Sequence, residues 1–317
     1  MENTLNLSSS PHITGKDTTR RIMIDVVIAL IPAVISGVYF FGARVLAVVL
    51  TSVISCVLWE YISRKVMKRS VTIADFSAVV TGILLALNLP PSIPLWIAAV
   101  GGFVAIVIIK QLFGGLGQNP ALGARVILML SWTQQMTNWA NPATPDVISA
   151  ATPLVALKKG QEIIETIRPD YLEFFLGHAL GSIGETSVLA LLIGGLYLIY
   201  RKVISPVIPL SFIGSAALLV FIFGGDNPFT GDFVYHILAG GIILGSFFMA
   251  TDYSTSPVTT KGKIIMGIGC GIITSVIRLY ANYPEGVSFA ILLMNVLTPM
   301  IDKFTVPTSF GGETKNA

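Results

Sequence analysis

The chain has 317 residues, of which 53% are hydrophobic and only 12% are charged, and its formal net charge is +3. A soluble domain of this size carries roughly twice that charged fraction, and the mean hydropathy here is +0.78. The composition therefore excludes an ordinary soluble protein and indicates a polytopic membrane protein. The two cysteines lie inside apolar runs and the three histidines are scattered, so we expect no metal site.

Apolar runs of roughly membrane-spanning length, about 20 residues each, alternate with short polar connections along the chain. Some are full-length, whereas others are shortened or broken by glycine and proline, as in transporters whose broken helices surround a site near the middle of the membrane. In chain order the candidate spans are 22–42, 45–62, 75–89 (short), 95–113, 121–134 (short), 187–200 (short), 206–224, 233–250, 263–280 and 287–301 (short).

The two halves of the chain resemble each other in the order of their features. Each half contains a Pro-bearing break, as in "LNLPPSIP" and "STSPVTT", followed by a Gly-bearing span and a further span. Because each half has an odd number of spans, the second repeat must be inverted relative to the first. We therefore predict an all-α membrane protein of about ten transmembrane helices in two inverted five-helix repeats with short broken helices. The predicted segments are an N-terminal tail (1–20), a first membrane repeat (21–134), a linker (135–186), a second membrane repeat (187–303) and a C-terminal tail (304–317).

Positive charges predict the orientation of these spans. If the N-terminus is cytoplasmic, most of the 20 Lys and Arg residues fall on the cytoplasmic side, and Arg125 is left within a span. This bias predicts a multi-pass protein of the cell (inner) membrane with both tails in the cytoplasm. The linker 135–186 is then extracytoplasmic.

The Gly-rich loop "FGGLGQNPALGAR" contains Asn119 and Arg125. Its glycines either let a ligand approach the backbone or allow tight packing between helices. A charge at membrane depth such as Arg125 needs a partner. The partner is either a ligand or an acidic side chain, or else the guanidinium extends to the cytoplasmic interface.

Two further polar positions follow apolar runs in the second half. In "MATDYSTSPVTTKGK", Asp252 either coordinates a cation or pairs with Lys261 or Lys263. In "LLMNVLTPMID", Asn295 is typical of a side chain that hydrogen-bonds across helices. Asp252 and Asn295 are our candidates for ion coupling. No motif of a hydrolase, kinase or metal enzyme is present in the sequence.

The heptapeptide "GSIGETS", residues 181–187, precedes the apolar run "VLALLIGGLYLIY". Ser182 followed by Glu185 matches a capping box, which predicts that Thr186 lies in the first turn of the next helix. A phosphate on its hydroxyl would there meet unpaired backbone N–H groups and the positive end of the helix dipole. Gly181 and Gly184 leave the approach open.

With this heptapeptide, five segments together resemble a known family: "GILLALNLPP", "GGLGQNPALGAR", "GSIGETS", "MATDYSTSP" and "FAILLMNVLTPMID". They are similar to the D subunit (RnfD) of the Rnf ion-translocating ferredoxin:NAD oxidoreductase complex. RnfD is related to the B subunit of the sodium-pumping NADH:quinone oxidoreductase. The resemblance covers nearly the whole chain, roughly 15–303, and the set of segments is much more specific than any one of them.

The resemblance implies a covalent FMN, whose phosphate a separate flavin transferase esterifies to the hydroxyl of Thr186. Ser182, Gly184 and Glu185 belong to the same site. This chain reads "IGET" where the general flavinylation pattern reads "SGAT". A second, weaker match is "ISAATPL" with Thr152, which lacks the glycine and precedes a proline.

The resemblance further implies a non-covalent riboflavin in the membrane part, for which Asn119, Arg125 and Asp252 are candidate ligands. The resemblance also implies that the helices of the chain form two inverted five-helix repeats, in agreement with the repeat found above. Implied partners are other Rnf-type membrane and iron–sulfur subunits, a second FMN-bearing subunit and the flavin transferase, with no nucleic acid.

Together these features predict a flavin-bearing subunit that relays electrons between ferredoxin and NAD while the complex moves Na⁺ or H⁺. Such a subunit is part of a multi-subunit translocase and is not active alone. The alternative is a passive channel or secondary transporter for a small solute, since inverted repeats with broken helices suit that role equally. A purely structural subunit that holds partners is a further possibility. A flavin on Thr186 separates the first interpretation from the others.

Overall fold

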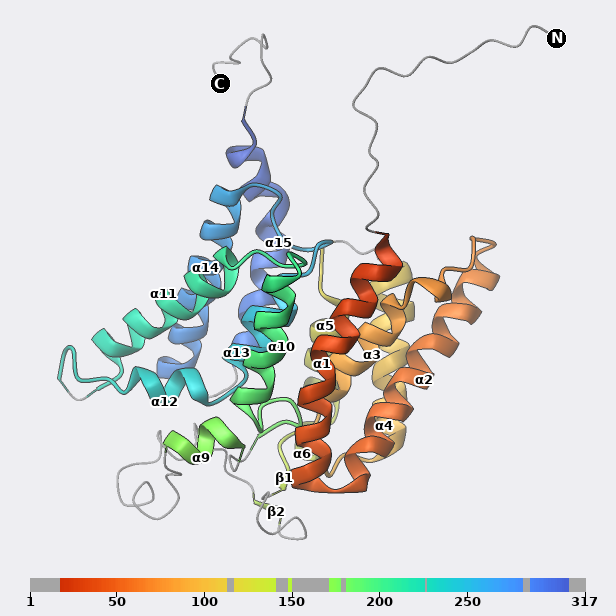
Figure 1. Cartoon of the computed structure of the whole chain (residues 1–317), viewed down its shortest axis with the longest axis horizontal. Coiled ribbons are helices and arrows are strands. Elements are labelled where there is room, and N and C mark those ends of the chain that lie inside the picture. Colours follow the sequence, from red (N-terminus) through yellow and green to blue (C-terminus); the bar gives the residue numbers. More distant parts are fainter. Residues whose placement is uncertain are drawn as a thin grey trace, which may run out of the picture.

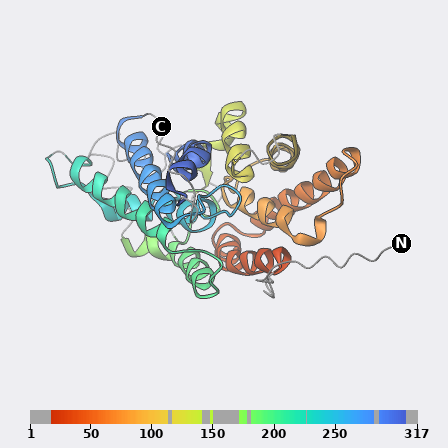
Figure 2. The ribbon, with the colours of Figure 1, turned by 90° about the horizontal axis from the view of Figure 1, so that it is seen from above.

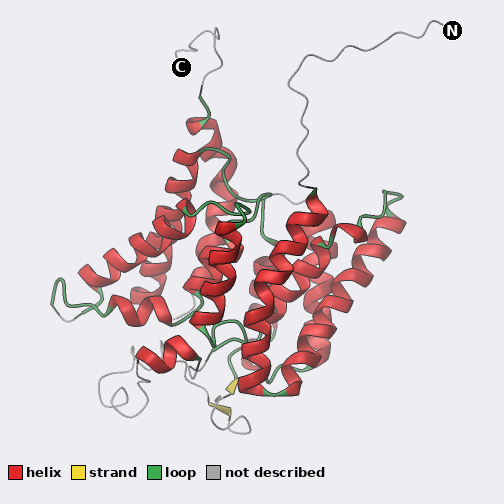
Figure 3. Ribbon diagram, viewed as in Figure 1, coloured by secondary structure: helices red, strands yellow, loops and turns green. Residues whose placement is uncertain are grey.

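The computed structural model describes residues 18–112, 117–140, 148–149, 171–177, 181–225, 227–281 and 286–307. Most of these residues are helical, and the short strands β1 (Trp139–Ala140) and β2 (Ile148–Ser149) form one antiparallel pair (Figure 3). Five helical segments are long and apolar enough to cross a membrane. The predicted class, a helical membrane protein, is confirmed.

The first half of the chain contributes two long helices and then shorter, interrupted ones. Gly42 joins the two long helices in the left-handed region at φ 78°, where a side chain would be strained, and its N–H donates to Val38 O at 2.9 Å. The elements are α1 (Thr19–Phe41), α2 (Ala43–Val66), the 3₁₀ turn η1 (Ile73–Asp75), α3 (Ser77–Leu87), α4 (Leu95–Phe103), the π-helical stretch η2 (Val104–Leu112), α5 (Pro120–Ser131) and α6 (Thr133–Met136).

The second half contains three long helices together with shorter and interrupted ones. Its elements are α9 (Tyr171–Leu176), α10 (Val188–Tyr200), α11 (Val207–Phe223), α12 (Phe233–Leu238), α13 (Ile242–Leu244), the π-helical stretch η3 (Gly245–Met249), α14 (Thr260–Tyr280) and α15 (Val287–Thr305).

Two predicted spans differ from the structure. The span predicted as continuous over 233–250 is broken between α12 and α13, where Gly240 and Gly241 have φ 73° and 71°. Arg278 of α14, only 1% exposed, donates to backbone carbonyls at this break, including Gly240 O at 2.6 Å and Ala239 O at 3.1 Å. These donations satisfy carbonyls that a broken helix leaves free. The span predicted as short over 287–301 is longer, because α15 continues through Pro299 to Thr305.

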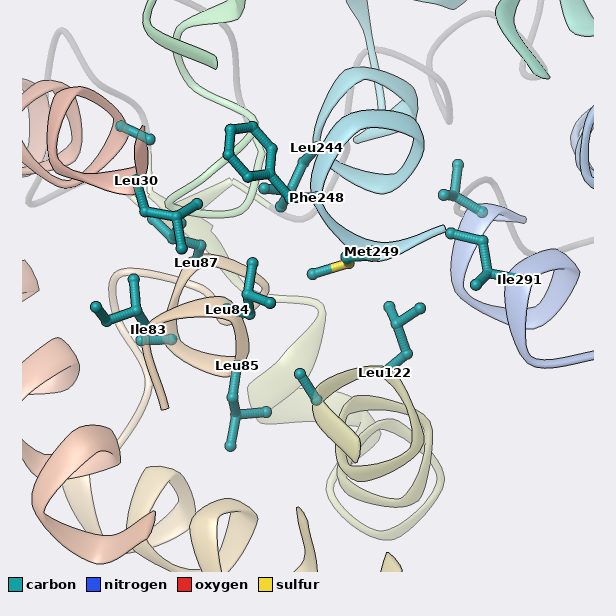
Figure 4. Packing of buried hydrophobic residues seen from close by; sticks show 14 of the residues in the cluster. Leu30, Ile83, Leu84, Leu85, Leu87, Leu122, Leu244, Phe248, Met249 and Ile291 are labelled. Atoms are coloured by element: carbon teal, nitrogen blue, oxygen red, sulfur yellow. The ribbon is translucent and has the colours of Figure 1, made fainter. Parts of the chain in front are cut away.

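The two halves lie side by side (Figures 1 and 2). Helix α1 packs against α10 and α5 against α15 across the two halves, whereas α11 packs against α14 within the second half. Helix α1 begins and α15 ends at the same end of the molecule, here called the termini end (top of Figure 1), and α10 begins nearer the opposite end. Apolar side chains of both halves meet in between, among them Leu84 and Leu87 of α3 and Phe248 and Met249 near the end of η3 (Figure 4).

Candidate functional site at the GSIGETS turn

The GSIGETS segment is buried along its whole length and lies on the break that follows α3. The N–H of Ile183 donates to Leu89 O at 3.1 Å, and the N–H of Gly184 donates to Leu87 O at 2.7 Å. The last carbonyls of a helix lack partners within the helix. The segment therefore supplies donors to the end of α3 and is held there by backbone hydrogen bonds.

Gly184 is required by this close approach. A Cβ at Gly184 would lie 2.9 Å from the Cβ and 3.0 Å from the carbonyl oxygen of Leu87, and 3.0 Å from Cδ2 of Leu244. Real Cβ atoms rarely have contacts this short, so a larger residue would lift the segment off α3. Its role is close packing against α3, not the open approach that the sequence suggested.

The cap of α10 is Ser187, not Ser182 as the capping-box pattern predicted. Ser187 has extended backbone angles, and its hydroxyl accepts from Ala190 N at 3.3 Å. Residues 182–185 close a separate turn, in which Glu185 N donates to Ser182 O at 3.0 Å. The prediction that Thr186 lies in the first helical turn is therefore wrong, because Thr186 precedes the cap of α10.

Thr186 is fully enclosed, with 0% of its surface exposed. Its hydroxyl donates toward two backbone carbonyls, Ser182 O at 3.2 Å and Ile183 O at 2.9 Å. The neighbouring hydroxyl of Ser182 is also buried, and among the described residues it has no hydrogen-bond partner. The turn thus contains two buried hydroxyl groups, of which one is satisfied by the turn itself.

Arg125 connects this turn to both halves of the molecule. Its guanidinium donates to Asn88 Oδ1 at 2.9 Å and to Ser288 Oγ at 3.1 Å, and it lies 4.0 Å from the carboxylate of Glu185. Glu185 also accepts from the N–H of Ser182 at 3.4 Å. Arg125 is 5% exposed and Glu185 9%. Arg125 is therefore the centre of a buried polar network and does not extend to the membrane interface.

The predicted polar residue Asn119 caps α5, and its side-chain oxygen accepts from Ala121 N and Leu122 N at 3.1 and 3.3 Å. With its amide placed to match its neighbours, Asn295 accepts from Asn119 N at 3.2 Å and donates to Thr255 O at 3.3 Å. Asn295 is 0% exposed. The expectation that it hydrogen-bonds across helices is confirmed, since it ties α15 to the start of α5.

A cavity of about 280 Å³ lies between the two halves near the termini end. Asn119 and Asp252 line it, as does Leu84 of α3, whereas Arg125 is not among its lining residues. Most of its wall is apolar and comes from α1, α3, α5, α10 and η3. The structure therefore places two of the three candidate ligands of a second flavin at one cavity, and places Arg125 in the GSIGETS network.

The predicted ion pair of Asp252 with Lys261 or Lys263 is not formed among the described residues. Asp252 instead accepts from the hydroxyl of Ser254 at 2.9 Å and lines the cavity. The two lysines lie in the first turn of α14, beyond the break that follows η3. Thr152, the weaker match to a flavin site, lies outside the described residues.

Sequence reasoning missed two members of the Arg125 network, Asn88 and Ser288. It also missed a buried ion pair near the termini end, in which Lys110 Nζ lies 3.0 and 3.1 Å from the two carboxylate oxygens of Glu60. Glu60 is 0% exposed. A signal was available for Asn88 and Glu60, since each is a polar residue inside an otherwise apolar run.

Comparison with known proteins gives matches over nearly the whole chain. The model of the NQR2, RnfD, RnfE family matches residues 6–311. The chain is 50% identical over 312 residues to the D subunit of the Na(+)-translocating ferredoxin:NAD(+) oxidoreductase complex of Acetobacterium woodii, covering 97% of this chain and 95% of the relative. It is 47% identical to the D subunit of the proton-translocating ferredoxin:NAD(+) oxidoreductase complex of Clostridium ljungdahlii, covering 98% and 97%. The D subunit of an ion-translocating oxidoreductase complex of Cellvibrio japonicus is 37% identical over 97% of this chain and 95% of its own length. The chain belongs to the NQR2, RnfD, RnfE family.

Proposed function

We propose that this chain is the flavin-bearing D subunit of a membrane complex that couples electron transfer between ferredoxin and NAD to the movement of Na⁺ or H⁺. In this proposal FMN is esterified to Thr186 and a second, non-covalent flavin occupies the cavity near the termini end. The first two relatives described above are named for different ions, Na⁺ and protons. Overall sequence identity to these relatives therefore does not tell which ion the complex would move.

The single observation that carries the proposal is the position of the GSIGETS turn relative to this cavity. Leu87 of α3 contacts the turn through its backbone, and Leu84 of the same helix lines the cavity. Three residues of α-helix rise about 4.5 Å. Leu84 and Leu87 are thus about one helical turn apart on α3 (Figure 4), so the proposed attachment turn and the cavity contact the same short apolar helix, an arrangement suited to two redox groups in series.

The residues of the turn fit a phosphoester in kind. The turn supplies the Thr186 hydroxyl and the buried hydroxyl of Ser182, which has no partner among the described residues. Helix α5 adds the guanidinium of Arg125 beside Glu185. Thr186 is 0% exposed, so its hydroxyl must leave its two backbone acceptors before an ester can form. A bound flavin supplies electron transfer that side chains cannot, while the protein holds and orients it.

The cavity fits an aromatic ring with a polar edge. Its volume of about 280 Å³ is close to the lower limit of about 300 Å³ for ligand pockets, which are mostly apolar with a few oriented polar groups. Asn119 and Asp252 would supply such groups to the riboflavin. Asp252 and Asn295 stay our candidates for ion coupling.

The proposal includes two inverted five-helix repeats. The elements correspond in order when α1, α2, α3, α4 with η2, and α5 are matched to α10, α11, α12 to η3, α14 and α15. The third member of the second set is broken at Gly240, whereas its counterpart α3 is a short helix that ends at Leu87. The proposed orientation has both tails in the cytoplasm, with the other Rnf-type subunits as partners and a flavin transferase for maturation.

In-gel flavin fluorescence under denaturing conditions tests the covalent site. The chain is co-expressed with a flavin transferase as wild type, Thr186→Ala, Thr186→Ser and Thr152→Ala. We expect fluorescence in the wild type and Thr152→Ala and its complete loss in Thr186→Ala, with partial labelling of Thr186→Ser because that residue keeps a hydroxyl. A wild-type band without fluorescence would refute the covalent flavin and favour the channel alternative.

A further inference from the structure

A second cavity, of about 200 Å³, adjoins the first at the termini end. Arg21 lines it from the first turn of α1, and Arg201 and Lys202 line it from the turn after α10. The acidic residue among its described lining is Asp25, which lies 3.1 Å from Arg201 and accepts from the hydroxyl of Tyr197 at 3.1 Å. The carboxylate of Asp25 is therefore already engaged, and the cavity keeps an excess of positive charge.

Arg21 and Lys202 supply this excess. Among the residues that the structure describes, neither has an ion-pair partner, and the first turn of α1 contains no acidic residue. The neighbouring Arg20 is directed elsewhere, with its guanidinium 5.7 Å from the centre of the Phe76 ring. Two cations at the mouth of one cavity attract an anion.

Lys202 stands where a helix end usually has glycine. The N–H of Val203 donates to Leu198 O and that of Lys202 to Ile199 O, both at 2.9 Å, which is a Schellman motif. Lys202 has φ 58°, a left-handed conformation that a side chain disfavours. Lys68 ends α2 in the same way with φ 53°, but it does not line this cavity. The same residue type in the same backbone motif thus gives a matched control.

An apolar path runs away from the cationic cavity along α1. Ile28 and Ile35 follow Arg21 at intervals of seven residues, so the three lie on one face of the helix. The exposed fractions of the two isoleucines are 44% and 62%. A ligand with a charged head in the cavity and hydrocarbon tails along this face matches both features.

We propose that the cavity between Arg21 and Lys202 binds the phosphate of an anionic phospholipid whose acyl chains lie along α1. Basic pockets between membrane helices bind such headgroups, and each nearby Lys or Arg strengthens binding about fivefold. The combination of a positive cavity with an adjoining apolar face favours a lipid over a soluble phosphate. The site lies outside the proposed flavin positions and does not depend on them.

Native mass spectrometry of the purified full-length chain tests this proposal, with phosphatidylglycerol and phosphatidylcholine of identical acyl chains as probes. We expect the wild type to bind one phosphatidylglycerol more tightly than phosphatidylcholine. Lys202→Asn, which tolerates the left-handed backbone, should weaken that binding about fivefold, and its combination with Arg21→Gln about 30-fold. Lys202→Arg should retain it.

Lys68→Asn is the control, because it removes the same charge from the same kind of helix end. Its affinity for phosphatidylglycerol should stay within about twofold of wild type. Equal weakening by Lys68→Asn and Lys202→Asn, or no preference for phosphatidylglycerol, would overturn the proposal. Displacement of the lipid by excess inorganic phosphate, combined with phosphate binding that Lys202→Asn abolishes, would refute the lipid and assign the site to a soluble anion.

Discussion

Arg125→Gln should strongly destabilise the chain, because Arg125 is the centre of the buried network around the GSIGETS turn. The substitution removes the positive charge 4.0 Å from Glu185 and at least one of the hydrogen bonds to Asn88 and Ser288. Glu185 is 9% exposed and would be left as a buried charge without its partner. Breaking a buried pair in this way costs about 3–5 kcal/mol.

Two free cysteines offer a direct assay. Cys56 and Cys270 are both buried, so a maleimide dye reports their exposure on heating. For a chain of this size about 1 kcal/mol shifts the midpoint by roughly 2–3 °C, and we expect Arg125→Gln to lower it by about 6–15 °C at a fixed heating rate. Combining it with Glu185→Gln should recover part of this loss, because neutralising both partners removes the buried charge.

Arg64→Gln is the matched control. Arg64 also lies 4.0 Å from a glutamate, Glu60, but that carboxylate keeps its closer contact with Lys110 at 3.0 Å. This i,i+4 pair should contribute only about 0.3–0.5 kcal/mol. Strictly additive effects of Arg125→Gln and Glu185→Gln, or a shift no larger than that of Arg64→Gln, would refute the reasoning.

Three more changes test the fold by the same thermal assay. Gly184→Ala should lower the free energy of unfolding by about 1–3 kcal/mol through overpacking. Its control is Gly214→Ala, whose Cβ would meet nothing within 4 Å and which should be neutral or stabilising. Equal shifts of the two midpoints would contradict the close-packing argument. Lys110→Met should lower the free energy of unfolding by about 3–5 kcal/mol, because it removes the nearest cation from the fully buried Glu60. A loss of stability under about 1 kcal/mol would show that water reaches the carboxylate. Arg278→Leu should lower the free energy of unfolding by several kcal/mol, because carbonyls at the broken helix lose their donors. It should also speed amide hydrogen exchange in α12. Unchanged exchange would contradict this role of Arg278.

Hydropathy predicted most of the helices because the same apolar residues that face lipid also mark the spans. The predicted spans 187–200 and 95–113 match α10 and the α4–η2 segment within a residue or so. The break at Gly240 and Gly241 was missed because it depends on backbone conformation within a run that stays apolar on both sides. A glycine pair in an apolar run is compatible with helix packing or with a break, and here Arg278 donates to the carbonyls that the break leaves free.

The candidate site was predictable in part for a similar reason. Arg125 and Asn295 stood out as polar residues in or beside apolar runs, where burial demands a partner, and Glu185 was selected as part of the heptapeptide. The partners of Arg125 were not predictable, because Asn88 is 37 residues away and meets it through the fold of the first half, whereas Ser288 is 163 residues away and meets it only when the two halves pack together. The misassigned cap of α10 has a local cause: both Ser182 and Ser187 can cap a helix, and the backbone turn between them selects Ser187.

The network that stabilises the chain also controls access to Thr186. The turn is held on α3 by backbone bonds from Ile183 and Gly184 and on α5 by the contact between Glu185 and Arg125. Under the proposed attachment of FMN to Thr186, which is fully enclosed, a flavin transferase would have to meet a state in which the turn has opened. Arg125→Gln should therefore have opposite effects, lowering thermal stability while raising the initial rate at which the transferase labels the purified flavin-free chain. If opening of the turn limits the labelling rate, the Arg64→Gln chain should be labelled at the wild-type rate. Equal rates for wild type and Arg125→Gln would mean that Glu185 and Arg125 do not hold the turn closed.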